Sequence, residues 1–330
     1  MIAMRQILLI LMVAGCLFGL SLRVDASGTS DAINGRLPTP KGLERDVKFW
    51  ERIFLEFTPD QCVIHDTWHL DIIYAVKRVP DGDSRRRQKL VKGYLRQVRQ
   101  ALTGLGNRGR PVNALERKVF AAVPEKHRNR AFFREAVDRV RCQRGVDLQP
   151  SLARSTRYVP MIKRVLRREN LPSDLAYLPH LESGFNRYAK SHAGAVGLWQ
   201  FMPYTAREGG LKVNRNKDYR HHPEKSTLAA AAHIRFIHQK TGSWPLTITA
   251  YNYGHNGVSR AIKKFGPDYM LIRRFHKTRI FGFAARNYYP SFLAARNVAI
   301  REEIADSKRM KKSNSRLAEN QEVARPRRGG

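Results

Sequence analysis

Glu182 is a candidate catalytic acid because of the apolar residues that precede it. Leu171, Leu175, Leu178 and Glu182 follow at intervals of four, three and four residues, so on a helix they share one face. An apolar face removes water from a carboxyl and raises its pKa, and a carboxylic acid that stays protonated near neutral pH can serve as a general acid. From the spacing alone, however, a glutamate that pairs with an arginine or caps a neighbouring helix is a better interpretation than a catalytic acid.

Helix signals surround this glutamate. Pro172 suits the first turn of a helix and Gly184 suits its end. Pro179 lies between them and removes one backbone hydrogen bond, which predicts a kink. Glu182 is therefore expected near the end of a kinked helix.

Three sequence blocks follow in a fixed order. Ser183 comes directly after Glu182, the block LWQFMP occupies residues 198–203 after a glycine-rich turn, and AYNYG occupies residues 250–254. Together these blocks resemble the soluble-lytic-transglycosylase (SLT) domain, which is related to goose-type lysozyme. Within that family the chain is most similar to the membrane-bound lytic transglycosylase D group. The motif-bearing resemblance covers about residues 150–300.

The resemblance implies an all-α fold with a goose-lysozyme-like catalytic domain at residues 150–303. A smaller helical domain is expected at residues 43–149, because the apolar spacing there favours helices and shows no clear alternation. Residues 27–42 are rich in Ser, Gly, Pro and Thr and are expected to form a flexible linker. Residues 304–330 are basic and nearly free of apolar side chains, which predicts a disordered tail.

The chemistry implied by the family uses a single carboxylate. Glu182 would protonate the oxygen that links N-acetylmuramic acid (MurNAc) to N-acetylglucosamine (GlcNAc), and would then accept the proton of the C6 hydroxyl as a 1,6-anhydro ring closes. Glycosidases usually need two carboxylates. The others between Glu182 and the third block are Glu208, Asp218 and Glu224, and no motif places any of them at the same bond. Two alternatives stay open: a hydrolytic muramidase that uses a second carboxylate, and a non-catalytic wall-binding scaffold.

Five further residues are implied as substrate ligands. Ser191, Gln200, Met202, Tyr251 and Asn252 match family positions near the catalytic carboxyl or along the sugar cleft. Buried amides and phenols need hydrogen-bond partners, and sugars supply them. The alternative for Gln200, Tyr251 and Asn252 is that they satisfy local backbone groups.

Charge and the first residues bear on the compartment. The chain of 330 residues carries 61 Lys and Arg against 28 Asp and Glu, a formal net charge of +33, which attracts polyanions. Residues 1–26 read as a signal peptide, with Arg5, an apolar run and small residues before Ser27. Export to the periplasm makes peptidoglycan and anionic envelope polymers the expected partners and excludes nucleic acid. A second interpretation makes Cys16 a lipidated residue, which would attach the protein to a membrane.

Cys62 and Cys142 remain after the signal peptide. In an oxidising compartment they could form one disulfide, or they could be two buried thiols. No Cys and His cluster has the spacing of a metal site and no glycine-rich phosphate loop occurs, so neither a metal nor a cofactor is predicted.

Overall fold

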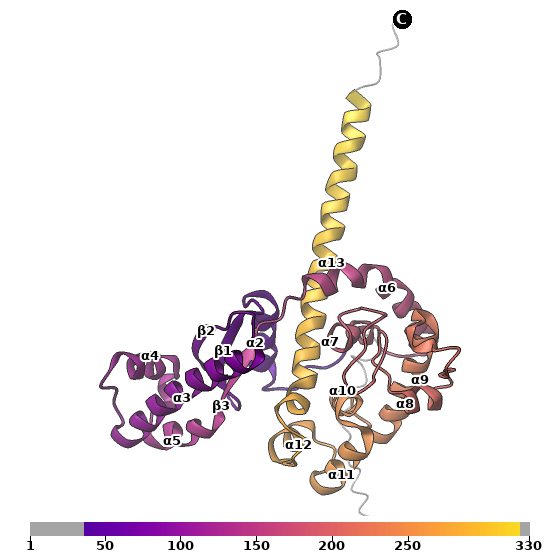
Figure 1. Ribbon diagram of the computed structural model, residues 1–330. Coiled ribbons are helices and arrows are strands. Elements are labelled where there is room, and N and C mark those ends of the chain that lie inside the picture. Colours follow the sequence, from indigo (N-terminus) through magenta and orange to yellow (C-terminus); the bar gives the residue numbers. More distant parts are fainter. Residues whose placement is uncertain (1–35, 324–330) are drawn as a thin grey trace, which may run out of the picture.

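The computed structural model describes residues 36–323, with side chains through residue 314. It contains a small domain at residues 58–146 and a large domain formed by residues 36–57 and 147–323 (Figure 1). The predicted signal peptide at residues 1–26, Cys16 and most of the predicted linker lie outside the described residues.

The small domain contains a sheet, so the prediction of a purely helical domain at residues 43–149 was wrong. Its strands are β1 (Gln61–Asp66), β2 (Ile73–Arg78) and β3 (Val140–Arg144), all antiparallel, in the order β2-β1-β3. The central strand β1 is buried at five successive positions. A strand buried on both faces lacks the apolar–polar alternation by which strands are recognised, and this explains the error.

Three helices complete the small domain (Figure 1). They are α3 (Ser84–Arg108), α4 (Ala114–Ala122) and α5 (Arg130–Arg139), joined by a 3₁₀ turn η1 (Glu125–His127). Gly106 lies inside α3 where α5 packs against it, and a Cβ there would come within 2.8 Å of the Arg134 Cγ. Glycine therefore allows the two helices to approach closely.

A disulfide joins Cys62 in β1 to Cys142 in β3. The two cysteines are 80 residues apart in sequence, and α3, α4 and α5 lie within the closed loop. Such a bond restricts the unfolded chain and so stabilises the small domain.

The large domain begins earlier than predicted. Helix α2 (Glu44–Leu55) lies beside α13 (Phe283–Val323), and its residues Val47, Phe49 and Ile53 belong to the core of the large domain. Helix α13 is the yellow helix that projects from the body in Figure 1. It continues through Val323, whereas the sequence predicts disorder from residue 304. Ala, Lys, Arg and Glu are strong helix formers, and they sustain a helix without an apolar face.

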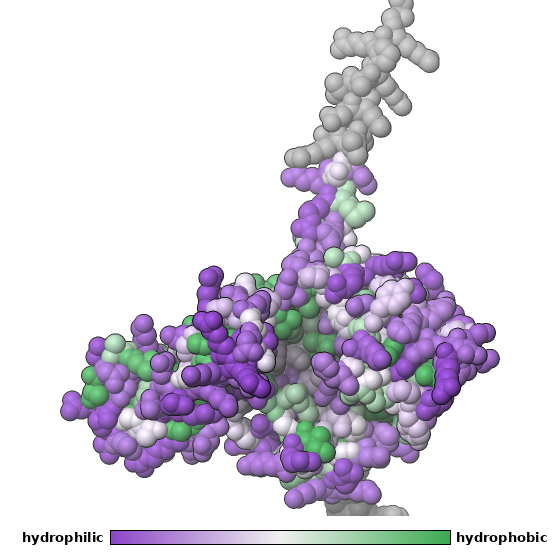
Figure 2. All heavy atoms as spheres, viewed as in Figure 1, coloured by the Kyte–Doolittle hydropathy of each residue, from purple (hydrophilic) through white to green (hydrophobic). Residues whose placement is uncertain are grey.

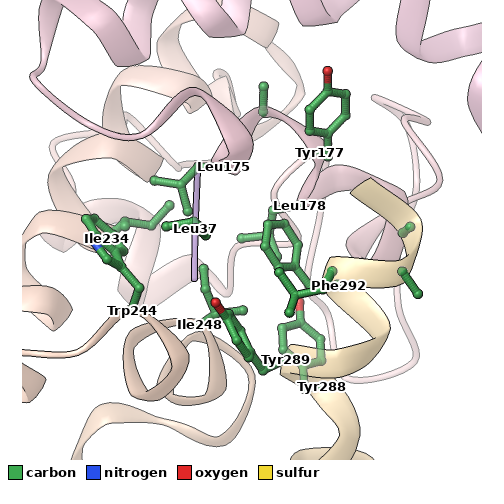
Figure 3. Packing of buried hydrophobic residues seen from close by; sticks show 14 of the residues in the cluster. Leu37, Leu175, Tyr177, Leu178, Ile234, Trp244, Ile248, Tyr288, Tyr289 and Phe292 are labelled. Carbon is green, nitrogen blue, oxygen red and sulfur yellow. The ribbon is translucent and has the colours of Figure 1, made fainter. Parts of the chain in front are cut away.

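Residues 36–42 pack against the large domain instead of forming a free linker. The backbone N–H of Leu37 donates to Asp174 at 2.8 Å, and Arg296 of α13 donates both to Asp174 at 2.7 Å and to the Leu37 carbonyl at 3.1 Å. Leu37 lies among the buried residues of the core in Figure 3. We refer to residues 36–42 as the strap.

The remaining elements of the large domain are helical. They are α6 (Gln149–Arg168), η2 (Ser173–Tyr177), α7 (Pro179–Glu182), α8 (Pro203–Glu208), η3 (Tyr219–His221), α9 (Pro223–Thr241), α10 (Trp244–Tyr253), α11 (His255–Phe265) and α12 (Tyr269–Phe275). The described part of the chain is thus mostly helical, as predicted. None of its helices is long and apolar enough to cross a bilayer.

Candidate active site

Glu182 is the last residue of α7, the end of the stretch whose spacing predicts one kinked helix. The structure divides that stretch into η2 and α7, and the second piece begins at Pro179. Gly184 follows with a φ of 55°, which reverses the chain at the position predicted to end the helix. The hydroxyl of Ser183 donates to the Leu198 carbonyl at 2.9 Å and so attaches the end of α7 to the LWQFMP block.

The carboxyl of Glu182 remains protonated to higher pH than an ordinary glutamate. Burial raises its pKa to about 7, while a hydrogen bond from the Tyr288 hydroxyl opposes that rise. The side chain is nevertheless partly accessible to solvent, so a substrate could reach it. Tyr288 comes from the second turn of α13, whose buried aromatic residues appear in Figure 3. The site therefore holds a carboxylic acid whose pKa lies near neutral pH.

Tyr251, near the end of α10 as predicted, connects the third block to the second. Its hydroxyl donates to the Trp199 carbonyl at 2.8 Å. The pKa of this phenol is raised well above 10, first by burial and then by the nearby charge of Glu182. Tyr251 is therefore a neutral neighbour of the acid whose own proton is directed to the backbone.

Gln200 has a local structural role in this structure. Its backbone has a φ of 48°, and its amide nitrogen donates to the carbonyls of Ala189 at 3.2 Å and Gly197 at 3.0 Å. Gly197 itself has a φ of 84°, and a Cβ there would lie 2.0 Å from the Arg220 carbonyl oxygen. These contacts correspond to the alternative in which Gln200 satisfies local backbone groups.

The other three predicted ligands differ in what they contact. The Ser191 hydroxyl accepts a hydrogen bond from the Ala195 N–H at 2.9 Å and so closes the glycine-rich turn. Met202 is 40% exposed, and Asn252 is also exposed. Met202 and Asn252 thus present side chains to solvent on the second and third blocks, where an incoming ligand could meet them.

The three other carboxylates do not join Glu182. Asp218 accepts three side-chain hydrogen bonds from Arg220, and this guanidinium holds the pKa of Asp218 below its ordinary value. Arg220 is buried and also donates to the carbonyls of residues 194 and 201, so the pair supports the loop. Glu208 and Glu224 are exposed on α8 and α9.

Tyr288 is the residue of the site that sequence reasoning missed. It lies 106 residues after Glu182 and outside the three blocks. No motif in the sequence distinguishes Tyr288 from the adjacent Tyr289. The two tyrosines lie on different sides of α13. Tyr288 donates to Glu182, whereas Tyr289 donates to the Pro38 carbonyl in the strap at 2.5 Å. Among the described residues, no group of three His, Cys, Asp or Glu side chains could hold a metal ion.

Comparison with known proteins agrees with the blocks around this site. Residues 160–268 match the family model described as the Transglycosylase SLT domain. Membrane-bound lytic murein transglycosylase D of Escherichia coli (strain K12) is 40% identical over 111 residues, which cover 33% of this chain and 25% of that protein. Membrane-bound lytic murein transglycosylase C of Histophilus somni (strain 2336) is 32% identical over 162 residues, covering 41% of this chain and 44% of that protein.

The chain therefore spans about a quarter to under a half of the length of these curated relatives. A solved structure of an inactive mutant of lytic transglycosylase Slt from Pseudomonas aeruginosa aligns with 44% of this chain and 24% of that chain, at 21% identity and a TM-score of 0.37. The stretch that matches the SLT family model, residues 160–268, includes Glu182, the LWQFMP block and Tyr251.

Proposed function

We propose that this protein is a peptidoglycan lytic transglycosylase that cleaves the β-1,4 bond between MurNAc and GlcNAc and forms 1,6-anhydroMurNAc. The observation that carries this proposal is Glu182, a carboxylic acid with a pKa of about 7, held by Tyr288 within an SLT domain. The names of the two relatives, both lytic murein transglycosylases, support the same substrate.

The reaction uses Glu182 twice. The protonated carboxyl donates its proton to the glycosidic oxygen while positive charge develops at the muramic C1. The resulting carboxylate then accepts the proton of the C6 hydroxyl, whose oxygen attacks C1 and closes the anhydro ring. One group serves as acid and then base most efficiently when its pKa lies near the working pH, and a pKa of about 7 meets that condition.

The surrounding residues position the acid and the sugar. Tyr288 donates to Glu182 and fixes the direction of its carboxyl. Met202 and Asn252, both exposed, are proposed to contact the substrate directly. Ser191, Gln200 and Tyr251 hold the same loops through their hydrogen bonds to backbone groups. To bind the substrate directly, they would have to exchange these hydrogen bonds for hydrogen bonds to the sugar.

Product analysis tests this proposal. The purified protein should release anhydro-muropeptides from sacculi, and Glu182→Gln should lower the rate by about a thousandfold, because the amide cannot donate and reclaim the proton. Asp218→Asn controls for damage to the loop that the Asp218–Arg220 pair supports. Glu224→Gln, at an exposed carboxylate, controls for the loss of one negative charge.

The products also separate the alternatives. Products with a reducing end, which carry one more water, would indicate a hydrolytic muramidase with a second carboxylate. Salt-sensitive binding to sacculi without any product, unchanged by Glu182→Gln, would indicate a non-catalytic scaffold.

The same proposal places the protein in the periplasm, with peptidoglycan as its partner. The support is the sequence of residues 1–26 together with the relatives' names, which describe membrane-bound proteins. Labelling of cells with palmitate tests whether Cys16 is lipidated, and N-terminal sequencing of the mature protein tests cleavage near Ala26.

A further inference from the structure

A row of basic side chains runs along α3, in the small domain. Arg85, Lys89, Lys92, Arg96 and Arg99 follow at intervals of four, three, four and three residues, and all five are exposed. This spacing keeps them on one face of the helix. At 1.5 Å per residue the row is about 21 Å long. We call these five residues the basic stripe.

The cations of the stripe have no acidic partners among the residues that the structure describes. Helix α3 contains no Asp or Glu. Within the described part of the chain, Arg85, Lys89, Lys92 and Arg96 form no ion pair, and Arg99 donates to the backbone carbonyls of α5 and β3. Like charges three or four positions apart destabilise a helix. Repulsion between these cations therefore lowers the stability of α3, and glutamates placed among them would remove that repulsion.

A shallow groove of about 560 Å³ lies against the stripe. It is lined by Lys92, Leu95, Arg96, Arg99, Gln100 and Thr103. The lining combines three cations with an amide, a hydroxyl and the apolar side chain of Leu95, and it includes none of the residues around Glu182. Hydrophilic residues cover much of the visible face of the small domain in Figure 2.

We propose that the basic stripe and its groove bind the carboxylates carried by a peptidoglycan strand. This proposal rests on the proposed function, which supplies a substrate with carboxylates on its peptide stems, or on its lactyl groups where a stem has been removed. A linear row of separate cations suits a polymer with spaced charges, and Gln100 and Thr103 can bond to its hydroxyls and amides.

A bilayer fits this surface less well. Helices that bind a membrane interface bury an apolar face in it. The apolar residues of α3, including Val98, Leu102 and Leu105, are instead buried in the core of the small domain. The stripe therefore offers charge and hydrogen bonds without an apolar face for insertion.

Two attachment points on one polymer raise its effective concentration at the active site. The stripe should therefore lower the KM for intact sacculi without changing the cleavage of a fragment too short to reach α3. This difference separates binding at the stripe from a general effect on folding.

The test compares two triple variants in a Glu182→Gln background, so that the polymer is not degraded during the measurement. The stripe variant is K89Q/K92Q/R96Q, and the control is K308Q/K311Q/K312Q on α13. Both remove three exposed, unpaired cations from a helix. At low salt the stripe variant should bind purified sacculi about tenfold more weakly than its parent, and the control should bind nearly as the parent does. Sacculi whose carboxylates have been converted to amides should bind the parent as weakly as native sacculi bind the stripe variant.

Several results would overturn the proposal: equal loss of binding in both triple variants, undiminished binding to amidated sacculi, or loss of binding only to vesicles that contain phosphatidylglycerol. The last result would assign the stripe to a membrane. Product analysis with Glu182 intact is independent of these measurements. Absence of anhydro products would therefore refute the proposed function while the binding result still decides the fate of the stripe.

Discussion

At the scale of single residues, Glu182 lowers stability at the pH at which it would act. Its pKa is about 7 in the folded protein, against an ordinary value of 4.5, because burial disfavours the charged form. Between these two values the folded protein keeps a proton that the unfolded chain releases. The associated stability is fully present below pH 4.5 and is lost as the pH rises through 7.

Glu182→Gln should therefore stabilise the protein in a pH-dependent manner. At pH 8 the variant should exceed the wild type by about 3 kcal/mol, or a few degrees in Tm, because the amide has no charge to bury. At pH 4.5 the two proteins should unfold alike. Thermal unfolding at both values measures the difference, and a gain that is equal at the two pH values would contradict a carboxylate origin.

Tyr288 should set the pH range of activity. Its hydrogen bond lowers the pKa of Glu182, so Tyr288→Phe should raise that pKa and move the basic limb of kcat/KM to higher pH. Tyr289→Phe is the matched control, since its hydroxyl bonds to the strap. An unmoved limb in Tyr288→Phe would show that the hydrogen bond does not tune the acid.

Sequence alone could locate Glu182 and Tyr251 because each lies in a short block whose neighbours are adjacent in the chain. It could not locate Tyr288, because the contact spans 106 residues and depends on the phase of α13. Gln200 shows the opposite limit. Its place in a motif is visible in the sequence, but the two carbonyls that it bonds appear only in the folded loop.

At the scale of elements, periodicity could identify the helices because apolar residues recur along them, as in α3 and α9. Periodicity did not identify the strands, because β1 is buried along its length and β3 continues directly from α5. The assignment of α2 to the large domain depends on its packing against α13, more than 200 residues later, which no local pattern contains.

The buried ion pair that binds the strap should contribute measurably to stability. Asp174 and Arg296 are 2.7 Å apart, and both are buried. Asp174→Asn leaves Arg296 without its counterion and should cost about 3 kcal/mol. Glu56→Gln is the control, because its pair with Arg52 is exposed and should contribute less than about 1 kcal/mol. Urea unfolding measures both, and equal small losses would mean that the strap is not fixed by this pair.

At the scale of the whole molecule, two buried histidines should make the fold sensitive to acid. Burial lowers the pKa of His65 to about 4 and that of His180 to about 3. His65 packs between Phe49 and Phe283 where the two domains meet, whereas His180 bonds to Ser151 within the large domain. Protonation therefore acts on both parts of the molecule.

The sign follows from the depressed pKa values. Below pH 6.5 the unfolded chain binds protons that the folded histidines do not, so stability is present above that pH and falls as the pH drops toward 4. Each histidine should contribute up to about 1.4 kcal/mol per pH unit. Chemical unfolding at several pH values measures the slope, and His180→Gln should reduce it by one proton. A slope between pH 6.5 and 4.5 that is the same in His180→Gln as in the wild type would contradict this prediction.

The strap also determines which domain receives a pulling force applied to the N-terminal end of the chain. The chain first enters the described structure at residues 36–42, which are bonded to Asp174, Tyr289 and Arg296 of the large domain. The small domain is inserted later, between α2 and α6. Tension applied through the first 35 residues is thus delivered to the framework that holds Glu182, and neither of the small domain's two connections transmits it.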